Sequence, residues 1–132
     1  MSNFTAGTII GTGIDLVKVE RIERVLTRRP SFVKRVFTDG ELSYCMTKRR
    51  PAEHLAARFG VKEAVMKAFG TGWTGGIRWT DAEVLRGESG RPEVRLTGRL
   101  RELADEMGVS AAHVSFSHDG GYAVAQVVLT GA

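Results

Sequence analysis

The longest regular pattern in this 132-residue chain is helical and covers residues 51–69, where Leu55, Phe59, Met66 and Phe69 form an apolar stripe. We therefore predict a long central helix. Lys62 falls in the middle of the stripe. A lysine at such a position is unfavourable unless its ammonium meets an anion or reaches solvent along its own stem.

Strand-like segments lie on both sides of this helix in the sequence. They cover residues 8–14, 82–86, 93–96, 113–118 and 122–130, and further helical segments cover 18–29, 39–47 and 98–107. Asp119-Gly120-Gly121 suits a tight hairpin between the last two strands, and residues 89–92 make a similar connection between the shorter pair. The order has no regular βαβ alternation. The sequence therefore predicts an α+β fold, in which an antiparallel sheet packs with the long central helix and shorter helices.

Length and composition fit a single domain over residues 1–132, because 42% of the residues are apolar and 26% are charged. No apolar run approaches a membrane span, and residues 1–7 lack the basic and apolar regions of a signal peptide, so we expect a cytoplasmic protein. Cys45 is the only cysteine and receives no role. The net charge of +4 favours an acidic partner, and fits nucleic acid, a phosphorylated cofactor or an acidic protein equally well.

The first strand carries an acidic residue beside two glycines. Side chains alternate along a strand, so Gly11, Gly13 and Asp15 share one face. Bare backbone next to a carboxylate lets a bulky ligand approach closely, which favours a ligand site. The alternative is that Asp15 caps the helix that follows.

Glu63 and Lys67 stand one turn apart on the flank of the central helix, which runs into Gly70, Thr71 and Gly72. They form either an ordinary salt bridge or, with Asp15 and Lys62, part of a ligand site. Two carboxylates and two lysines are suited to holding a divalent cation against a phosphate ligand, because magnesium prefers one or two carboxylates and completes its shell with phosphate and water. This combination points to phosphate chemistry.

Three arginines form a basic ridge on the helix at 18–29. Arg21, Arg24 and Arg28 project from one side, and Phe32 lies just beyond Pro30, which we expect to end this helix. The simplest interpretation is a solvated helix face.

Several ordered motifs resemble those of the holo-[acyl-carrier-protein] synthase family, which belongs to the 4′-phosphopantetheinyl transferases. They read Gly-Thr-Gly-Ile-Asp-Leu-Val at 11–17, Arg-Val-Phe-Thr at 35–38, Lys-Glu-Ala-Val-Met-Lys-Ala-Phe-Gly-Thr-Gly at 62–72, Gly-Arg-Pro at 90–92 and Val-Ser-Phe-Ser-His at 114–118. The similarity covers nearly the whole chain. It implies that family's fold and a role in fatty acid biosynthesis.

The resemblance implies transfer of 4′-phosphopantetheine from coenzyme A to a serine of apo acyl carrier protein, with Mg²⁺ as cofactor and adenosine 3′,5′-bisphosphate as product. By motif matching, Asp15 and Glu63 hold the metal and Lys62 and Lys67 hold phosphates, with Lys67 on the transferring group. Because the attacking serine belongs to the carrier, the chain needs no nucleophile of its own. We hypothesise that Glu63 orients or deprotonates the serine hydroxyl.

Further residues follow from the same motifs. The resemblance places coenzyme A beside Gly70, Thr71, Gly72 and His118, and beside Arg91 and Pro92 of the shorter hairpin; for His118 the alternative is a structural histidine. Arg21 matches the arginine that docks the acidic carrier protein, and Arg24, Arg28 and Phe32 are weaker candidates for the same surface. The family also implies a homotrimer with sites between subunits, for which Val124 and Val128 are candidate contacts. We expect neither nucleic acid nor membrane among its partners.

Two departures from the family pattern lie near these motifs. Gly60-Val61 replaces the frequent Ala-Ala, which adds a β-branched group near the site, and Asp119 replaces a frequent Thr, where we expect it to begin the turn.

Two alternative functions remain open in the sequence. One is the same chemistry on polyketide or peptide synthetase carriers. The other is a small basic nucleic-acid-binding module, with the arginine ridge for phosphates and Phe32, Phe37, Trp73 and Trp79 as stacking groups.

Overall fold

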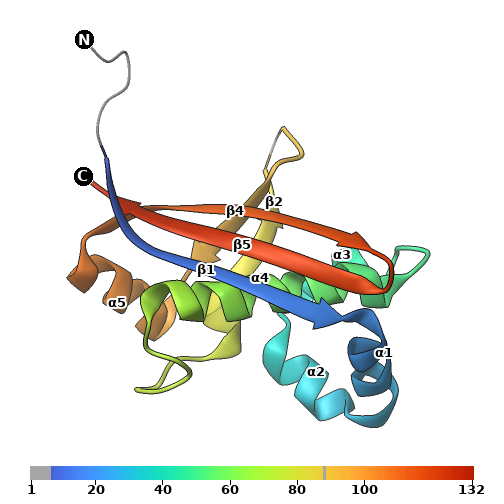
Figure 1. Ribbon diagram of the computed structural model, residues 1–132. Coiled ribbons are helices and arrows are strands. Elements are labelled where there is room, and N and C mark those ends of the chain that lie inside the picture. Colours follow the sequence, from blue (N-terminus) through green and yellow to red (C-terminus); the bar gives the residue numbers. More distant parts are fainter. Residues whose placement is uncertain (1–6, 88) are drawn as a thin grey trace.

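The computed structural model describes residues 7–87 and 89–132, so most of the segment inspected for a signal peptide lies outside the described residues. A three-stranded sheet lies along a long central helix, and shorter helices gather around that helix (Figure 1). In chain order the elements are β1 (Thr8–Lys18), α1 (Val19–Arg28), α2 (Pro30–Val36), α3 (Asp39–Cys45), α4 (Pro51–Phe69), η1 (Trp79–Asp81), β2 (Ala82–Arg86), β3 (Pro92–Leu96), α5 (Gly98–Met107), β4 (Val109–Asp119) and β5 (Tyr122–Gly131). The predicted α+β class is confirmed.

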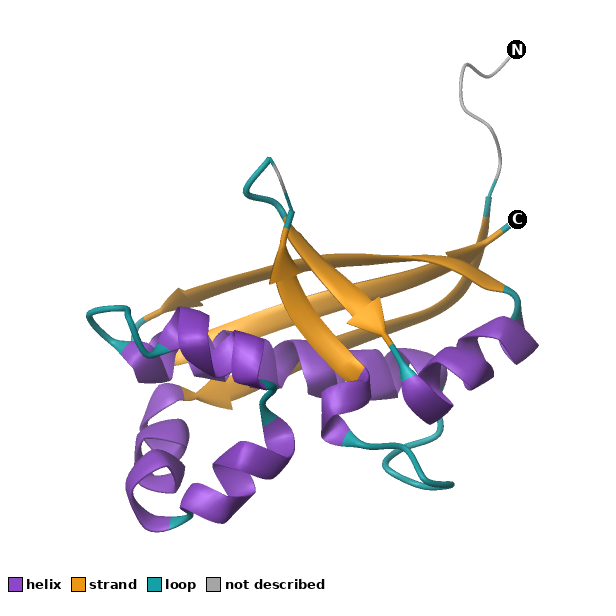
Figure 2. Ribbon diagram, turned by 180° about the vertical axis from the view of Figure 1, so that it is seen from behind, coloured by secondary structure: helices purple, strands orange, loops and turns teal. Residues whose placement is uncertain are grey.

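Both sheets are antiparallel. The larger has the strand order β1-β5-β4, and the smaller consists of β2 and β3, which stand steeply across the long strands (Figure 2). Asp119 pairs with Tyr122 across the two-residue turn between β4 and β5. Gly120 and Gly121 both have positive φ, at 58° and 83°, as a type I′ turn requires. The expected hairpin, and the expected place of Asp119 at its start, are confirmed.

Helix α4 packs so closely on β1 that two strand positions have no room for a side chain. A Cβ atom on Gly11 would lie 1.9 Å from the carbonyl oxygen of Ala68, and one on Gly13 would lie 1.9 Å from that of Ala64. Gly11, Gly13 and Asp15 share a face, as predicted. The space beside the glycines, however, is filled by helix backbone and not by a ligand, which corrects that part of the prediction.

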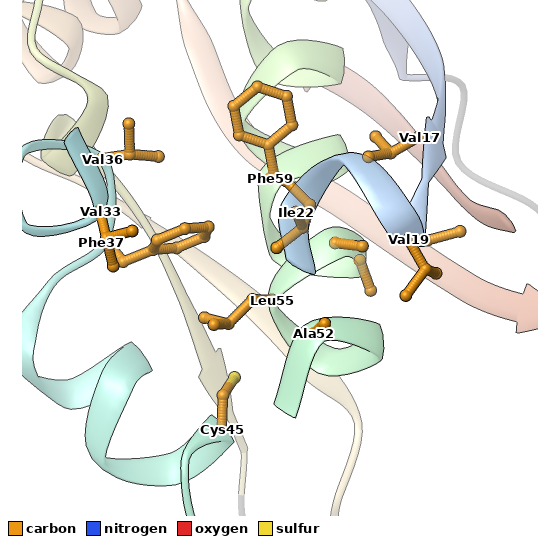
Figure 3. Close-up of a cluster of buried hydrophobic side chains, with 13 residues drawn as sticks. Val17, Val19, Ile22, Val33, Val36, Phe37, Cys45, Ala52, Leu55 and Phe59 are labelled. Carbon is orange, nitrogen blue, oxygen red and sulfur yellow. The ribbon is translucent and has the colours of Figure 1, made fainter. Parts of the chain in front are cut away.

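The core runs along α4 in two clusters. One gathers apolar side chains of β1, α1, α2 and the first half of α4, with Cys45 of α3 at its edge (Figure 3). The other joins the second half of α4 to β2, α5 and β5. Val61 belongs to the second cluster and is fully buried, so the substitution at this position is a core change and does not bring a β-branched group to the site.

The largest local difference from the sequence prediction is α2. We expected Pro30 to end a helix, and it does follow the end of α1. Pro30 also occupies the first turn of the next helix, where its missing N–H would have no intrahelical partner. No helix among the described residues is long and apolar enough to cross a membrane.

Candidate functional site

Asp15 and Lys67 connect β1 to α4. The Lys67 Nζ atom lies 3.0 Å from Asp15 Oδ1 and donates a second hydrogen bond, also of 3.0 Å, to the Ile14 carbonyl oxygen. Asp15 does not cap α1, because the N-cap residue is Lys18 and no side chain caps that helix. The alternative interpretation of Asp15 is therefore wrong, and its carboxylate faces the second half of α4.

Glu63 is half-buried beside the same pair. Its burial raises the pKa of the carboxyl, and the nearby Asp15 carboxylate raises it further, while Lys67, Arg21 and the Trp73 indole act in the opposite direction. The partner of Lys67 is Asp15, so the expected alternative of a simple Glu63–Lys67 salt bridge is not what the described residues form. Two acidic groups thus approach each other closely enough to repel.

The Asp15–Glu63 pair fits a divalent cation that takes its other ligands from phosphate and water. It does not fit a cation whose ligands all come from the protein. The described residues contain no group of three or more His, Cys, Asp or Glu side chains placed to hold a metal ion. Magnesium needs only one or two carboxylates when phosphate and water supply its other ligands. A cation between the two carboxylates would also relieve their repulsion and favour the ionised form of Glu63.

Arg21 is the member of the basic ridge that reaches this site. Its guanidinium lies 5.5 Å from the centre of the Phe59 ring, one helical turn before Glu63, and its charge lowers the pKa of Glu63. Arg24 forms an exposed ion pair with Glu20, at 3.7 Å, and Arg28 is exposed at the end of α1. The ridge therefore leads from the carboxylate pair out along α1.

Phe32 lies beyond the ridge and packs its ring edge-on against Trp79, at 6.5 Å between centroids. Trp79 in turn stacks on Phe59, and Phe37 is buried in the core. The aromatic residues named as stacking groups for a nucleic-acid-binding module are thus largely packed against one another within the fold.

Lys62 points away from the carboxylate pair, which contradicts its predicted contact with phosphate. The side chain is fully buried, and its Nζ atom lies 2.9 Å from Glu41 Oε1. The same atom donates to the carbonyl oxygens of Trp79, at 3.2 Å, and Ala82, at 2.6 Å. All three ammonium protons therefore have partners inside the chain. The anion that Lys62 required is Glu41, and its role is structural.

The loop after α4 begins at Gly70, which ends the helix with a φ of 75°, and continues through Thr71 to Gly72, with a φ of 67°. All three residues are exposed one turn beyond Lys67, so they border the same side of the molecule. This position agrees with the predicted course of the loop past a ligand.

His118 lies at the other end of α4. Its Nδ1 atom is 3.3 Å from Glu53 Oε2, and its ring meets the edge of His54 at 5.9 Å between centroids. Beyond His54, three cations lie over the Tyr44 ring. The charged groups of Lys48, Arg58 and Arg86 are 4.4, 4.7 and 5.5 Å from its centre. Burial alone would raise the pKa of Tyr44, but Arg86, Lys48 and Arg58 outweigh it and lower the pKa, so this end of α4 is strongly electropositive.

Arg91 and Pro92 lie in a third region, apart from the Asp15–Glu63 pair and from the surface around Tyr44 and His118. They border an open groove of about 430 Å³, whose opposite wall includes Ala112, Ser115 and Phe116 of β4. One chain therefore brings together Asp15, Glu63, Lys67 and Arg21, and leaves His118 and the Arg91–Pro92 turn apart from them.

Some residues of these regions are absent from the sequence-based site. Glu41 had a local signal, because Thr38 and Glu41 form a capping box at the start of α3. Tyr44 and Trp73 have no such signal, because their local sequences do not show that cations gather on the Tyr44 ring or that Trp73 lies beside Glu63.

Comparisons with known proteins agree with this fold and with the sequence motifs. The model of the 4′-phosphopantetheinyl transferase superfamily matches residues 11–127. The holo-[acyl-carrier-protein] synthase of Geotalea daltonii is 45% identical over 122 residues, which cover 92% of this chain and 98% of that protein. Fold and sequence similarity thus define a phosphopantetheinyl transferase.

Solved structures show the same relationship. The acyl carrier protein synthase of Plasmodium yoelii with ADP bound has a TM-score of 0.86 and 29% identity, covering 97% of this chain and 99% of that one. The Helicobacter pylori holo-[acyl-carrier-protein] synthase in complex with coenzyme A has a TM-score of 0.77 and 29% identity, covering 89% and 98%. The chain belongs to the holo-[acyl-carrier-protein] synthase family of the phosphopantetheinyl transferases.

Proposed function

We propose that this protein transfers 4′-phosphopantetheine from coenzyme A to a serine of apo acyl carrier protein, in a Mg²⁺-dependent reaction that serves fatty acid biosynthesis in the cytoplasm. The observation that carries the proposal is the Asp15–Glu63 pair, with Lys67 between β1 and α4 and Arg21 beside it. A family member solved with coenzyme A, and another with ADP, support a nucleotide-containing ligand.

Different residues of the candidate site would bind the cation and the phosphate. Asp15 and Glu63 would hold the cation, which supplies charge neutralisation on the pyrophosphate when bound. Lys67 is exposed, so its ammonium could exchange Asp15 for a phosphate oxygen, whereas Lys62 is fully buried. Lys67 is therefore the lysine that we place on the transferring phosphoryl group, with Gly70, Thr71 and Gly72 beside it.

In the proposed step, the serine oxygen of the carrier forms a bond to the phosphorus that bears the pantetheine arm. The bond from that phosphorus to the leaving oxygen breaks, and adenosine 3′,5′-bisphosphate departs. The serine proton passes to Glu63, directly or through a water. An ionised Glu63 carboxylate beside the serine is suited to accept this proton.

The rest of coenzyme A requires a positive surface away from the carboxylates. The cations around Tyr44, together with His118, supply one at the start of α4. Arg91 and Pro92 border a separate groove. Their separation from the Asp15–Glu63 pair supports sites shared between subunits.

A homotrimer would bring these parts together, and the outer face of the larger sheet offers the surface for it. Ile14 and Leu16 on β1 are 61% and 64% exposed, and Val124 on β5 is 37% exposed. Val124 thus faces outward, as expected. An apolar sheet face of this kind is typical of a contact with another protein surface.

The acidic carrier protein would dock on Arg21, Arg24, Arg28 and Phe32, because this surface is basic and leads directly to Glu63. Charge reversal tests the docking: Arg21→Glu should raise the KM for the carrier protein about tenfold or more and affect coenzyme A binding much less. The matched control is Arg101→Glu, an exposed arginine on α5 that pairs with Asp105. Equal damage to both substrates would contradict the docking proposal.

The reaction itself is tested by intact-mass analysis of apo acyl carrier protein after incubation with this protein, coenzyme A and Mg²⁺. We expect a gain of one phosphopantetheine that EDTA abolishes and that Glu63→Gln reduces at least a hundredfold. Carriers from polyketide and peptide synthetases, assayed in parallel, measure carrier choice. No gain on any carrier from a folded protein would refute the proposal.

A further inference from the structure

An aromatic stack ties the loop after α4 to the helix face that carries Glu63. Trp73 lies against Trp79, with 3.8 Å between ring centroids, and Trp79 stacks on Phe59, at 5.3 Å and an interplanar angle of 20°. Phe59 and Glu63 are one turn apart on α4, so they project from the same side. The stack therefore holds the loop over Glu63.

The indole N–H of Trp73 is buried and has no hydrogen-bond partner. A buried donor without a partner is unfavourable, and such groups are rare in folded proteins. This one lies beside the Glu63 carboxylate, close enough to lower the pKa of that group. The Glu63 carboxylate is therefore the candidate acceptor for this N–H.

We propose that Trp73 is a positioning residue for Glu63, whose indole N–H donates to one carboxylate oxygen when the other oxygen is drawn toward a divalent cation. The inference rests on the proposed function, since it needs a cation at the Asp15–Glu63 pair. The hydrogen bond would fix the rotation of the carboxylate and hold the loop in place over it. Trp73 itself touches neither the reacting phosphorus nor the serine.

Nuclear magnetic resonance can observe this hydrogen bond in the unaltered protein. The chain has only two tryptophans, so protein labelled with ¹⁵N-tryptophan shows two indole N–H signals, and Trp79→Phe assigns them. On addition of Mg²⁺ and coenzyme A, the Trp73 signal should move downfield. In Glu63→Gln, whose amide accepts a weaker hydrogen bond, the movement should largely disappear. A Trp73 signal that keeps its position in the wild-type protein would overturn the proposal.

Binding of Mn²⁺, measured by electron paramagnetic resonance with coenzyme A present and no carrier, gives the energetic test. Trp73→Phe keeps a ring in the stack and removes the N–H, and should weaken Mn²⁺ binding about tenfold. Trp79→Phe removes an N–H from the same stack away from Glu63 and should change binding less than about twofold. In a Glu63→Gln background, Trp73→Phe should cause no further loss. Equal binding by Trp73→Phe and wild type, or an equal further loss in the Glu63→Gln background, would refute the inference.

Failure of this inference is distinguishable from failure of the proposed function. Wild-type protein that binds no Mn²⁺ with coenzyme A would refute the metal-dependent reaction and the role of Trp73 together. Wild-type protein that binds Mn²⁺, with Trp73→Phe unchanged, would refute only the role of Trp73.

Discussion

Two lysines of one motif have opposite environments. Lys62 is fully buried against Glu41, while Lys67 is 55% exposed and meets Asp15. Each residue turns a helix by about 100°, so five residues place the two side chains on different faces. The sequence motif predicts both lysines as phosphate ligands. It cannot distinguish them, because the partner of Lys62 is Glu41, which lies 21 positions upstream and outside the motif.

Removal of the Lys62 charge should destabilise the fold strongly. Lys62→Met leaves Glu41 buried and unpaired, so we expect a loss of about 3–5 kcal/mol in the free energy of unfolding, measured by urea denaturation. Lys67→Met is the matched control, since it breaks a pair whose lysine is exposed and which is worth about 1 kcal/mol. Adding Glu41→Gln to Lys62→Met should recover part of the loss. Similar losses in Lys62→Met and Lys67→Met would show that the buried pair is not structural.

The role of a single residue is predictable from the sequence where it depends on one helix or strand. The shared face of Gly11, Gly13 and Asp15 follows from strand alternation alone. The capping box predicts Glu41 at the start of α3 but not its pairing with Lys62, which lies 21 positions away. The local sequences of Tyr44 and Trp73 do not show which groups they meet in the fold.

The contact between β1 and α4 is the element-scale basis of the site, because it sets the position of Asp15 relative to Glu63. Gly13→Ala would place a methyl group 1.9 Å from the Ala64 carbonyl oxygen, which is backbone and cannot turn aside. We expect a loss of about 3 kcal/mol or more by thermal unfolding, and a fall in turnover at temperatures where the variant is folded.

The control for this substitution is Gly7→Ala, whose added carbon would lie 3.7 Å from the Gly131 carbonyl oxygen, an ordinary contact. It should change stability by less than about 0.5 kcal/mol. If both variants are equally stable, the strand and helix are not as closely packed as described.

The junction of α3, β2 and β3 should make stability depend on pH. Burial alone would raise the pKa of Glu83, but hydrogen bonds from Thr38 and Arg95 outweigh it and lower the pKa below the ordinary 4.5. The unfolded chain then binds more protons than the folded one, so this contribution is complete above pH 4.5 and is lost as the pH falls through the lower folded pKa.

Glu83→Gln tests this dependence by urea denaturation across pH. The variant should be about 1–2 kcal/mol less stable than wild type at pH 7, and the difference should shrink below pH 4.5. A constant difference between pH 7 and pH 3 would contradict the assignment of the effect to the Glu83 carboxylate.

Element boundaries were predictable where the pattern was long and regular. The sequence prediction matches the bounds of α4 and α5, and those of β2. It ends β1 at residue 14, four residues early, and starts β4 at 113 instead of Val109, because the missing parts lack a strict alternation of polar and apolar residues. Helix α2 was missed because a proline that follows one helix can also begin the next.

At the scale of the whole molecule, the outer sheet face should determine the assembly. We expect wild type to have about three times the chain mass of 14.4 kDa in solution, by light scattering after size exclusion. Leu16→Lys places a charge on the apolar face and should give monomers with little activity. Ser43→Lys, an exposed change on α3, should leave the trimer intact. A monomeric wild type that is active would contradict the shared sites.

Most side chains of α4 are buried, so the helix should not tolerate a change in its number of residues. Inserting one residue between His54 and Glu63 would turn the following part of the helix by about 100° and advance it by about 1.5 Å. Every later side chain would leave its core contact, and the two ligand-facing ends of the helix would lose their relative orientation together. Insertions and deletions within α4 should therefore be lost by selection, because each would disrupt the core and the candidate site together.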